Sequence, residues 1–186
     1  MPRKPSWEKR IEIGQIEINK PNPFSKEDIR QLVVACLKEK GISGKVFLVK
    51  NAEEIKEIHN KNKLGHIVWI EFVADSFHVA VVGAGKDIGF PHNQSVGTWK
   101  ILSQIKNGEK SVEWDMSEVI VAVIEGLDTG GFGIKNVNNI LKCRNGVEHC
   151  IGEYLIEKNV PVINFYSHKN YLEIFWKKCE LNNYEI

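Results

Sequence analysis

The stretch HIVWIEFVADSFHVAVV, residues 66–82, decides the fold. Residues 66–73 and 77–82 are rich in β-branched and aromatic side chains, which favour strands. The three residues between them, Ala74, Asp75 and Ser76, are typical of a turn. We therefore predict two antiparallel strands joined as a hairpin, and this hairpin is the expected centre of a sheet.

Outside the hairpin, helices and strands alternate along the chain. Ser25 is positioned to cap a helix with one apolar face, and Gly41 is positioned to end it. Strands are predicted at 45–49, 119–124 and 160–166, helices near 51–60, 95–107 and 147–158, and a glycine-containing loop at 83–89. The prediction is one α/β domain over residues 1–186, with residues 1–20 as an N-terminal arm and strand. Its mixed β-sheet has a central antiparallel hairpin flanked by helices.

Composition limits the class of protein. The chain has 186 residues and a formal net charge of +1, with 42% hydrophobic and 26% charged residues, which excludes a disordered chain and a strongly basic nucleic-acid binder. No apolar stretch approaches the roughly 20 residues that a membrane-spanning helix needs. No apolar segment follows the basic residues at the start, and the four cysteines are widely separated, so we expect a cytoplasmic, reduced protein that does not bind membranes.

A glycine-rich loop follows the most apolar predicted strand. Residues 119–124 are apolar throughout, and Gly130, Gly131 and Gly133 precede a predicted amphipathic helix that contains Lys135. Glycines let backbone N–H groups approach a ligand closely, and the start of a helix adds unpaired N–H donors with a partial positive charge. The pattern favours phosphate binding, to which Lys135 adds charge. The alternative is that the glycines only make a tight connection from strand to helix.

Residues 131–141, GFGIKNVNNIL, resemble the hairpin and second helix of the helix-hairpin-helix family. The resemblance covers about eleven residues, and it implies a turn whose backbone amides contact a DNA phosphate. The P-loop signature is not matched, because Phe132 and Gly133 stand where that motif has Lys and then Ser or Thr. This difference counts against a nucleoside triphosphatase.

Acidic residues on or beside the predicted strands form the candidate catalytic set. Glu71 lies inside an apolar strand, Asp75 in the hairpin turn, Asp87 after the second strand and Glu125 after the apolar run. We expect Glu71, Asp75 and Glu125 to be catalytic, and Glu71, Asp75 and Asp87 to hold Mg²⁺ against a phosphate oxygen, as in phosphodiester hydrolysis. The alternative for Glu71 is an outward-facing polar position on a half-exposed sheet. The nuclease pattern of Asp followed by Glu-x-Lys is absent from these strands, so such a site is expected only in degenerate form.

The cysteines are expected to be structural. Cys36 falls on the apolar face of the first predicted helix, as a small core residue does. Cys143 and Cys150 do not have the spacing of a structural zinc site, and we expect them to pack between two helices.

These patterns together predict a protein that binds a phosphate-bearing ligand, with nucleic acid as the leading candidate. Its catalytic form would be a nuclease-like hydrolase that cleaves phosphodiesters with Mg²⁺. Two alternatives are open. One is a non-catalytic interaction domain, a homodimer with a purely structural glycine loop, and the other is an enzyme that acts on a small metabolite at the strand ends.

Overall fold

The computed structural model describes residues 20–50, 53–54, 56–58, 67–85, 102–107, 109–124 and 144–165. Its regular elements are α2 (Lys26–Glu39), β1 (Gly44–Val49), β2 (Ile67–Val73), β3 (Val79–Gly85), β4 (Lys106–Asn107), β5 (Lys110–Ser111), β6 (Trp114–Ile124), α5 (Arg144–Glu157) and β7 (Val162–Phe165). The predicted N-terminal strand and the glycine-rich loop with the helix after it lie outside the described residues. None of the helices among the described residues is long and apolar enough to span a membrane.

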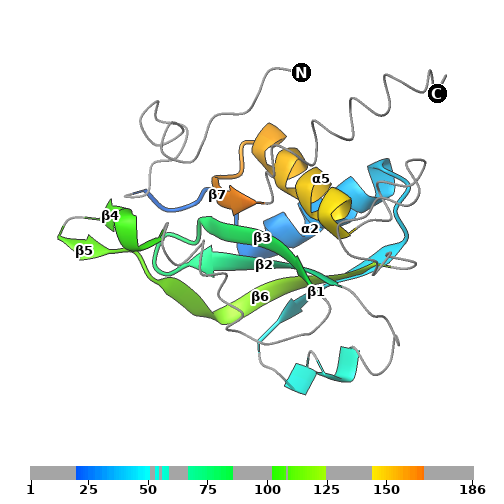
Figure 1. Ribbon diagram of the computed structural model, residues 1–186, viewed down its shortest axis with the longest axis horizontal. Coiled ribbons are helices and arrows are strands. Elements are labelled where there is room, and N and C mark those ends of the chain that lie inside the picture. Colours follow the sequence, from blue (N-terminus) through cyan, green and yellow to red (C-terminus); the bar gives the residue numbers. More distant parts are fainter. Residues whose placement is uncertain are drawn as a thin grey trace.

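Five strands form one mixed sheet in the order β1-β6-β2-β3-β7. β1 pairs with β6, β6 with β2, and β2 with β3, all antiparallel, whereas β7 runs parallel to β3. The β2–β3 hairpin therefore lies at the centre of the sheet (Figure 1). The predicted α/β fold, with a mixed sheet, a central antiparallel hairpin and flanking helices, is confirmed.

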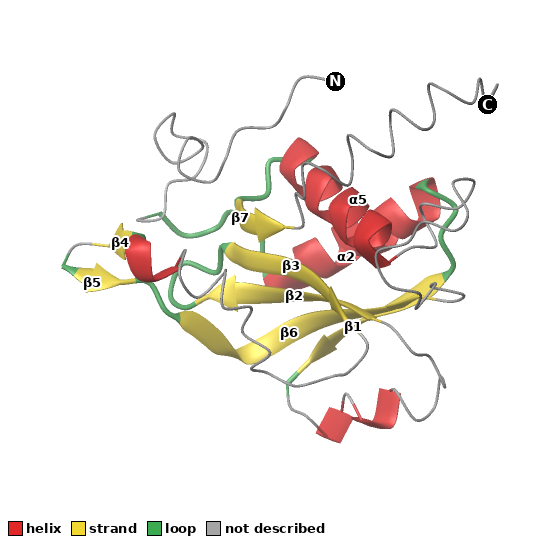
Figure 2. Cartoon of the chain, in the orientation of Figure 1, coloured by secondary structure: helices red, strands yellow, loops and turns green. Residues whose placement is uncertain are grey.

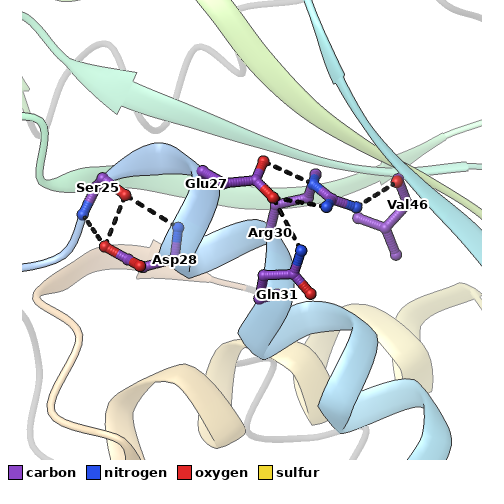
Figure 3. Close-up of polar contacts among 6 residues, drawn as sticks. All are labelled: Ser25, Glu27, Asp28, Arg30, Gln31 and Val46. Carbon is purple, nitrogen blue, oxygen red and sulfur yellow. Dashed lines mark hydrogen bonds and ion pairs between the residues drawn. The ribbon is translucent and has the colours of Figure 1, made fainter.

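Helix α2 begins where its sequence provides a cap. The Ser25 hydroxyl oxygen accepts the N–H of Asp28 at 3.1 Å, and the Asp28 carboxylate accepts the N–H of Ser25 at 2.8 Å, which completes a capping box (Figure 3). Arg30 donates to the carbonyl oxygen of Val46 in β1 at 3.2 Å, so it ties the helix to the edge of the sheet (Figure 3). The helix ends before Gly41, whose φ of 64° is the left-handed conformation that glycine adopts at such positions.

Helices α2 and α5 lie side by side on one face of the sheet (Figure 1). Both turn an apolar face toward the strands, and full burial of each large side chain contributes about 1.5–3 kcal/mol relative to exposure. The main core contains Ile29, Val33 and Leu37 of α2, Val147, Ile151 and Leu155 of α5, and Val68, Ile70, Phe72, Val82, Ile120 and Ala122 of the strands. This face of the sheet is therefore completely covered along the middle strands.

The opposite face of the sheet carries two smaller apolar clusters. In the first, Trp69 and Ile58, the latter from the helical residues 56–58 drawn below the sheet in Figure 2, both pack against a cluster that includes alternate residues of β6. In the second, Ile105 packs against Val73 near the end of β2. Because both faces have cover, residues 119–124 are all buried, as the apolar run predicts.

The loop predicted at 83–89 is wrong in its first three residues, because β3 continues to Gly85. Gly83 pairs with Trp69 of β2, and a Cβ atom on Gly83 would lie only 2.7 Å from Trp69 Nε1. The indole ring fills the space that a side chain would take, so the strand continues through a glycine that composition alone assigns to a loop.

The helix predicted to reach residue 107 also ends earlier. Residues 102–104 are helical, but Lys106–Asn107 form β4, which pairs with β5 as a separate two-stranded sheet. The Val112 N–H donates to the Ile105 carbonyl oxygen at 3.1 Å, next to this pairing. A local hairpin thus replaces the last turn of the predicted helix.

Candidate functional site

Glu71 lies where the pairing of the central strand is irregular. Its partner in β3 is Val81, and the register between β2 and β3 shifts directly after it. On the other side, β2 pairs with β6 at Ile70 and again at Phe72, and Glu71 falls in the register shift between them. Bulges of this kind re-aim side chains and are over-represented beside active sites. Because Ile70 and Phe72 point into the helix-covered core, Glu71 points to the opposite face.

Glu71 is buried, and along β2 it lies between the two apolar clusters of that opposite face. Its neighbours there are Trp69, in the first cluster, and Val73, in the second. Glu71 is only 6% exposed, and its Oε2 atom has no hydrogen-bond partner in the part of the chain that the structure describes. The interpretation of Glu71 as an outward-facing polar residue is therefore wrong, because segments distant in sequence cover this face.

Burial also changes the acidity of Glu71. A low-dielectric environment disfavours the charged form, and burial raises the pKa of this carboxyl group from its ordinary value of 4.5 to about 7. A carboxyl group with a pKa near 7 can accept or release a proton at neutral pH, and once ionised it can ligate a cation. These properties make Glu71 the strongest candidate for a reactive group among the described residues.

Asp75 lies in the hairpin turn, in a different environment from Glu71. It is exposed, with a φ of 63°, and Phe77 has a φ of 54°. Positive φ is costly for residues other than glycine, so the turn needs support from outside. Asn22 provides this support, since its N–H donates to the carbonyl oxygen of Ser76 at 2.7 Å and its Nδ2 donates to that of Phe77 at 2.9 Å. Glu71 and Asp75 thus share one hairpin, with Asp75 at the tip and Glu71 in the buried middle.

The other end of the hairpin is where β3 and β6 both end. Gly85, the last residue of β3, pairs with Ile67, and Val123 of β6 pairs with the same residue. At about 3.3 Å per residue along a strand, this end lies roughly 20 Å from Val73, where the turn begins. Asp75 and the exits of β3 and β6 are therefore at opposite ends of the central hairpin, with Glu71 between them.

The other predicted site residues, Asp87, Glu125, Gly130, Gly131, Gly133 and Lys135, lie outside the described residues. Within the described ranges, no group of three or more His, Cys, Asp or Glu residues could hold a metal ion. The predicted Mg²⁺ site and the predicted phosphate-binding loop therefore stay predictions.

Sequence reasoning missed a partly buried ion pair at the start of α2. Lys26 Nζ lies 2.5 Å from Asp115 Oδ2 and donates to the Ser117 hydroxyl oxygen at 2.9 Å, and the side chains of Lys26 and Asp115 are each only 10% exposed. The same ammonium group lies 5.3 Å from the ring centroid of Phe72 and 5.2 Å from that of Phe77. Burial alone would raise the pKa of Asp115, but hydrogen bonds from Lys26 and Ser117 outweigh it and hold this pKa below its ordinary value.

The charges of this ion pair neutralise each other within the fold, whereas the Oε2 atom of Glu71 has no hydrogen-bond partner among the described residues. Asp115 pairs with Phe72 across the sheet and so faces α2, on the side of the sheet away from Glu71. No sequence pattern links residue 26 with residue 115, because their contact depends on the packing of α2 on the sheet and on the register shift that places Asp115 opposite Phe72. Among the described residues, Glu71 is therefore the centre of the candidate site. No known protein family, no curated protein and no solved structure matches this chain.

Proposed function

We propose that the protein binds a phosphate-bearing ligand, nucleic acid being the leading candidate, and that Glu71 is the ionisable group of the binding site. The observation that carries the proposal is the buried carboxyl group of Glu71 on the central strand, whose Oε2 has no partner within the described part of the chain. Burying an acidic group without a partner is expensive. A bound cation or a protonated ligand would relieve that cost, so the group is suited to a ligand.

A divalent cation is the natural link between this carboxyl group and a phosphate. A carboxylate repels a phosphate directly, whereas Mg²⁺ binds oxygen atoms of both. In the catalytic form of the proposal, Glu71 helps to hold Mg²⁺ against a phosphate oxygen, and the protein hydrolyses phosphodiesters. Because the hairpin tip and the exits of β3 and β6 lie at opposite ends, the candidate further ligands are either Asp75 at the tip or Asp87 and Glu125, which follow those exits in the sequence. Candidate phosphate contacts are Gly130, Gly131, Gly133 and Lys135.

Cation binding at Glu71 is coupled to proton release. Because the pKa of Glu71 is about 7, the carboxyl group is mostly protonated at pH 6, and a cation has to displace the proton. At pH 8 the group is mostly ionised, and no such displacement is needed. We expect the apparent affinity for Mg²⁺ to rise about tenfold per pH unit below pH 7 and to level off above it.

The test compares the wild type with Glu71→Gln, which keeps the size of the side chain and removes its ionisation. The matched control is Glu113→Gln, which removes an exposed carboxylate close to the start of β6. Fluorescently labelled single- and double-stranded oligonucleotides report binding with and without Mg²⁺, and plasmid DNA with Mg²⁺ or Mn²⁺ reports cleavage. We expect Glu71→Gln to weaken Mg²⁺-dependent binding about tenfold or more and to remove its pH dependence, while Glu113→Gln behaves as wild type. Equal affinity and equal cleavage for all three proteins would exclude Glu71 from the function.

A salt titration separates phosphate binding from the alternative of a non-catalytic homodimer. Binding to phosphates weakens steeply as the salt concentration rises, whereas apolar self-association does not. A salt-insensitive dimer in sedimentation velocity, without oligonucleotide binding, would favour the interaction domain. Thermal stabilisation by a small phosphate or nucleotide alone would instead favour an enzyme that acts on a small metabolite.

A further inference from the structure

Two cysteines lie against each other where α2 contacts α5. Cys36 of α2 is completely buried, and Cys150 of α5 is partly exposed. Cys36 Sγ donates to the backbone carbonyl oxygen of Cys150 at 4.0 Å, so the two residues are in direct contact. The two residues are 114 positions apart, so only the packed helix pair brings them together (Figure 1). The expected partner of Cys150, Cys143, lies outside the described residues.

The surroundings make the two thiols chemically different. Cys36 donates a hydrogen bond to Cys150 and is buried, and both effects raise its pKa far above the ordinary value. Interaction with the Cys36 thiol lowers the pKa of Cys150, against the effect of burial. The charges of Lys40 and His149 also lower this pKa, while that of Glu153 raises it. Cys150 is therefore the better nucleophile, and Cys36 is the thiol that keeps its proton.

We propose that Cys36 and Cys150 are a redox-active pair, in which a peroxide oxidises Cys150 and Cys36 then closes a disulfide that joins α2 to α5. Partial exposure gives the peroxide access to Cys150, and the contact of Cys36 Sγ with the Cys150 carbonyl oxygen places the resolving sulfur against the same residue. The proposal is independent of phosphate binding. The thiol pair belongs to the helix-covered core, whereas Glu71 points to the other face of the sheet.

The reaction is balanced with hydrogen peroxide as the oxidant. The Cys150 thiolate attacks one peroxide oxygen, an S–O bond forms as the O–O bond breaks, and hydroxide leaves with the proton released by Cys150 as water. The sulfur of Cys36 then attacks the Cys150 sulfenic acid, so an S–S bond forms and the S–O bond breaks. The departing hydroxide takes the proton of Cys36 and becomes a second water. Two thiols are oxidised by two electrons, and one peroxide is reduced to two waters.

Peptide mapping identifies the bond directly. Trypsin releases Cys36 within residues 31–38 and Cys150 within residues 145–158, and each of these peptides contains a single cysteine. The full chain is reduced, desalted, treated with hydrogen peroxide, blocked with N-ethylmaleimide and digested without reduction. We expect a linked 31–38/145–158 peptide, about 2 Da lighter than the two thiol peptides combined. Cys143→Ser and Cys179→Ser are the matched controls and should leave the yield unchanged.

Two variants test the order of the steps. In Cys36→Ala the resolving sulfur is missing, so we expect Cys150 sulfenic acid to accumulate and to be trapped by dimedone on peptide 145–158. In Cys150→Ser we expect Cys36 to stay a thiol under the same treatment. A disulfide from Cys150 to Cys143 or Cys179, dimedone labelling of Cys36, or no oxidation of Cys150 in the wild type would each overturn the proposal.

The effect of the Lys40 charge on the pKa of Cys150 can be measured separately from the packing of the two helices. The rate at which iodoacetamide alkylates Cys150 follows the thiolate fraction, so its pH midpoint reports the pKa of this thiol. We expect Lys40→Gln to move the midpoint to higher pH, Lys40→Arg to restore it, and Lys38→Gln, an exposed lysine on the same helix, to leave it unchanged. A midpoint that is the same in the wild type and Lys40→Gln would show that Lys40 does not promote ionisation of Cys150.

Discussion

Replacing Glu71 by glutamine should make the protein more stable at high pH. Glu71 is 6% exposed, and its Oε2 has no hydrogen-bond partner among the described residues. Its negative charge therefore destabilises the folded protein but not the unfolded chain, in which water solvates the carboxylate. Glutamine has nearly the same size and no charge. The variant therefore removes the cost of ionisation and leaves the packing of the sheet almost unchanged.

The size of the effect follows from the two pKa values of this carboxyl group. The pKa is about 7 in the folded protein and near the ordinary 4.5 in the unfolded chain, so the folded state binds the proton more tightly. The stability that depends on this proton is fully present below pH 4.5 and is lost as the pH rises through 7. The difference of about 2.5 pKa units corresponds to about 3 kcal/mol. Near pH 4 the two proteins should be equally stable, and at pH 8 the Tm of Glu71→Gln should be higher by roughly 6–12 °C.

Urea denaturation followed by tryptophan fluorescence, between about pH 4 and pH 8 and with EDTA present, measures this difference. The control is Glu113→Gln, whose stability relative to wild type should change by less than about 0.5 kcal/mol over the same range. The reasoning is refuted if the Glu71→Gln difference does not grow with pH, or if this variant is the less stable protein at pH 8. Added Mg²⁺ should stabilise the wild type at pH 8 and leave Glu71→Gln unchanged. If the pH effect occurs without the Mg²⁺ effect, the burial of Glu71 is confirmed and its proposed role as a Mg²⁺ ligand is refuted.

Three further substitutions test the packing described above by urea denaturation. Asp115→Asn removes the charge that pairs with Lys26, and it should lower the free energy of unfolding by about 1–3 kcal/mol at pH 7. The loss should shrink as the pH falls below the ordinary value of 3.8, because the unfolded chain then binds the proton first, and it should vanish once the pH is also below the lowered pKa of the folded protein. Gly83→Ala should cost about 1–3 kcal/mol, because its Cβ would lie 2.7 Å from Trp69 Nε1, and a second substitution, Trp69→Val, should recover part of the loss. Ser25→Ala removes the helix cap and should cost about 1 kcal/mol, whereas Ser25→Asn should retain most of the stability. A loss below about 0.3 kcal/mol would contradict the structural role given to the substituted residue.

The sequence predicts elements well where residues close together determine them. The cap and end of α2 follow from Ser25 and Gly41, because each acts on its own helix terminus. The central hairpin follows from two strand-forming runs around a short turn. The burial of residues 119–124 follows from their uninterrupted apolar character.

Sequence-based prediction fails where the environment of a residue is set by a contact with a residue distant in the sequence. Nothing near Gly83 shows that the ring of Trp69 covers it, so the glycine indicates a loop. Similarly, nothing near Glu71 shows which segments cover its face of the sheet, and burial is the property that gives this residue its unusual pKa. The pairing of Cys36 with Cys150 has the same origin, because it depends on how two helices pack and leaves no local pattern.

The position of β6 has a consequence for synthesis of the chain. Gly44 of β1 pairs with Ile124 of β6, and β6 also separates β1 from β2, so β1 joins the sheet only through a strand made much later. Until the ribosome has released Trp114–Ile124, the amides and apolar side chains of β1 are open to neighbouring chains. Translation products that stop before residue 114 should therefore aggregate, and a chaperone that shields residues 44–49 on the nascent chain should raise the yield of folded protein.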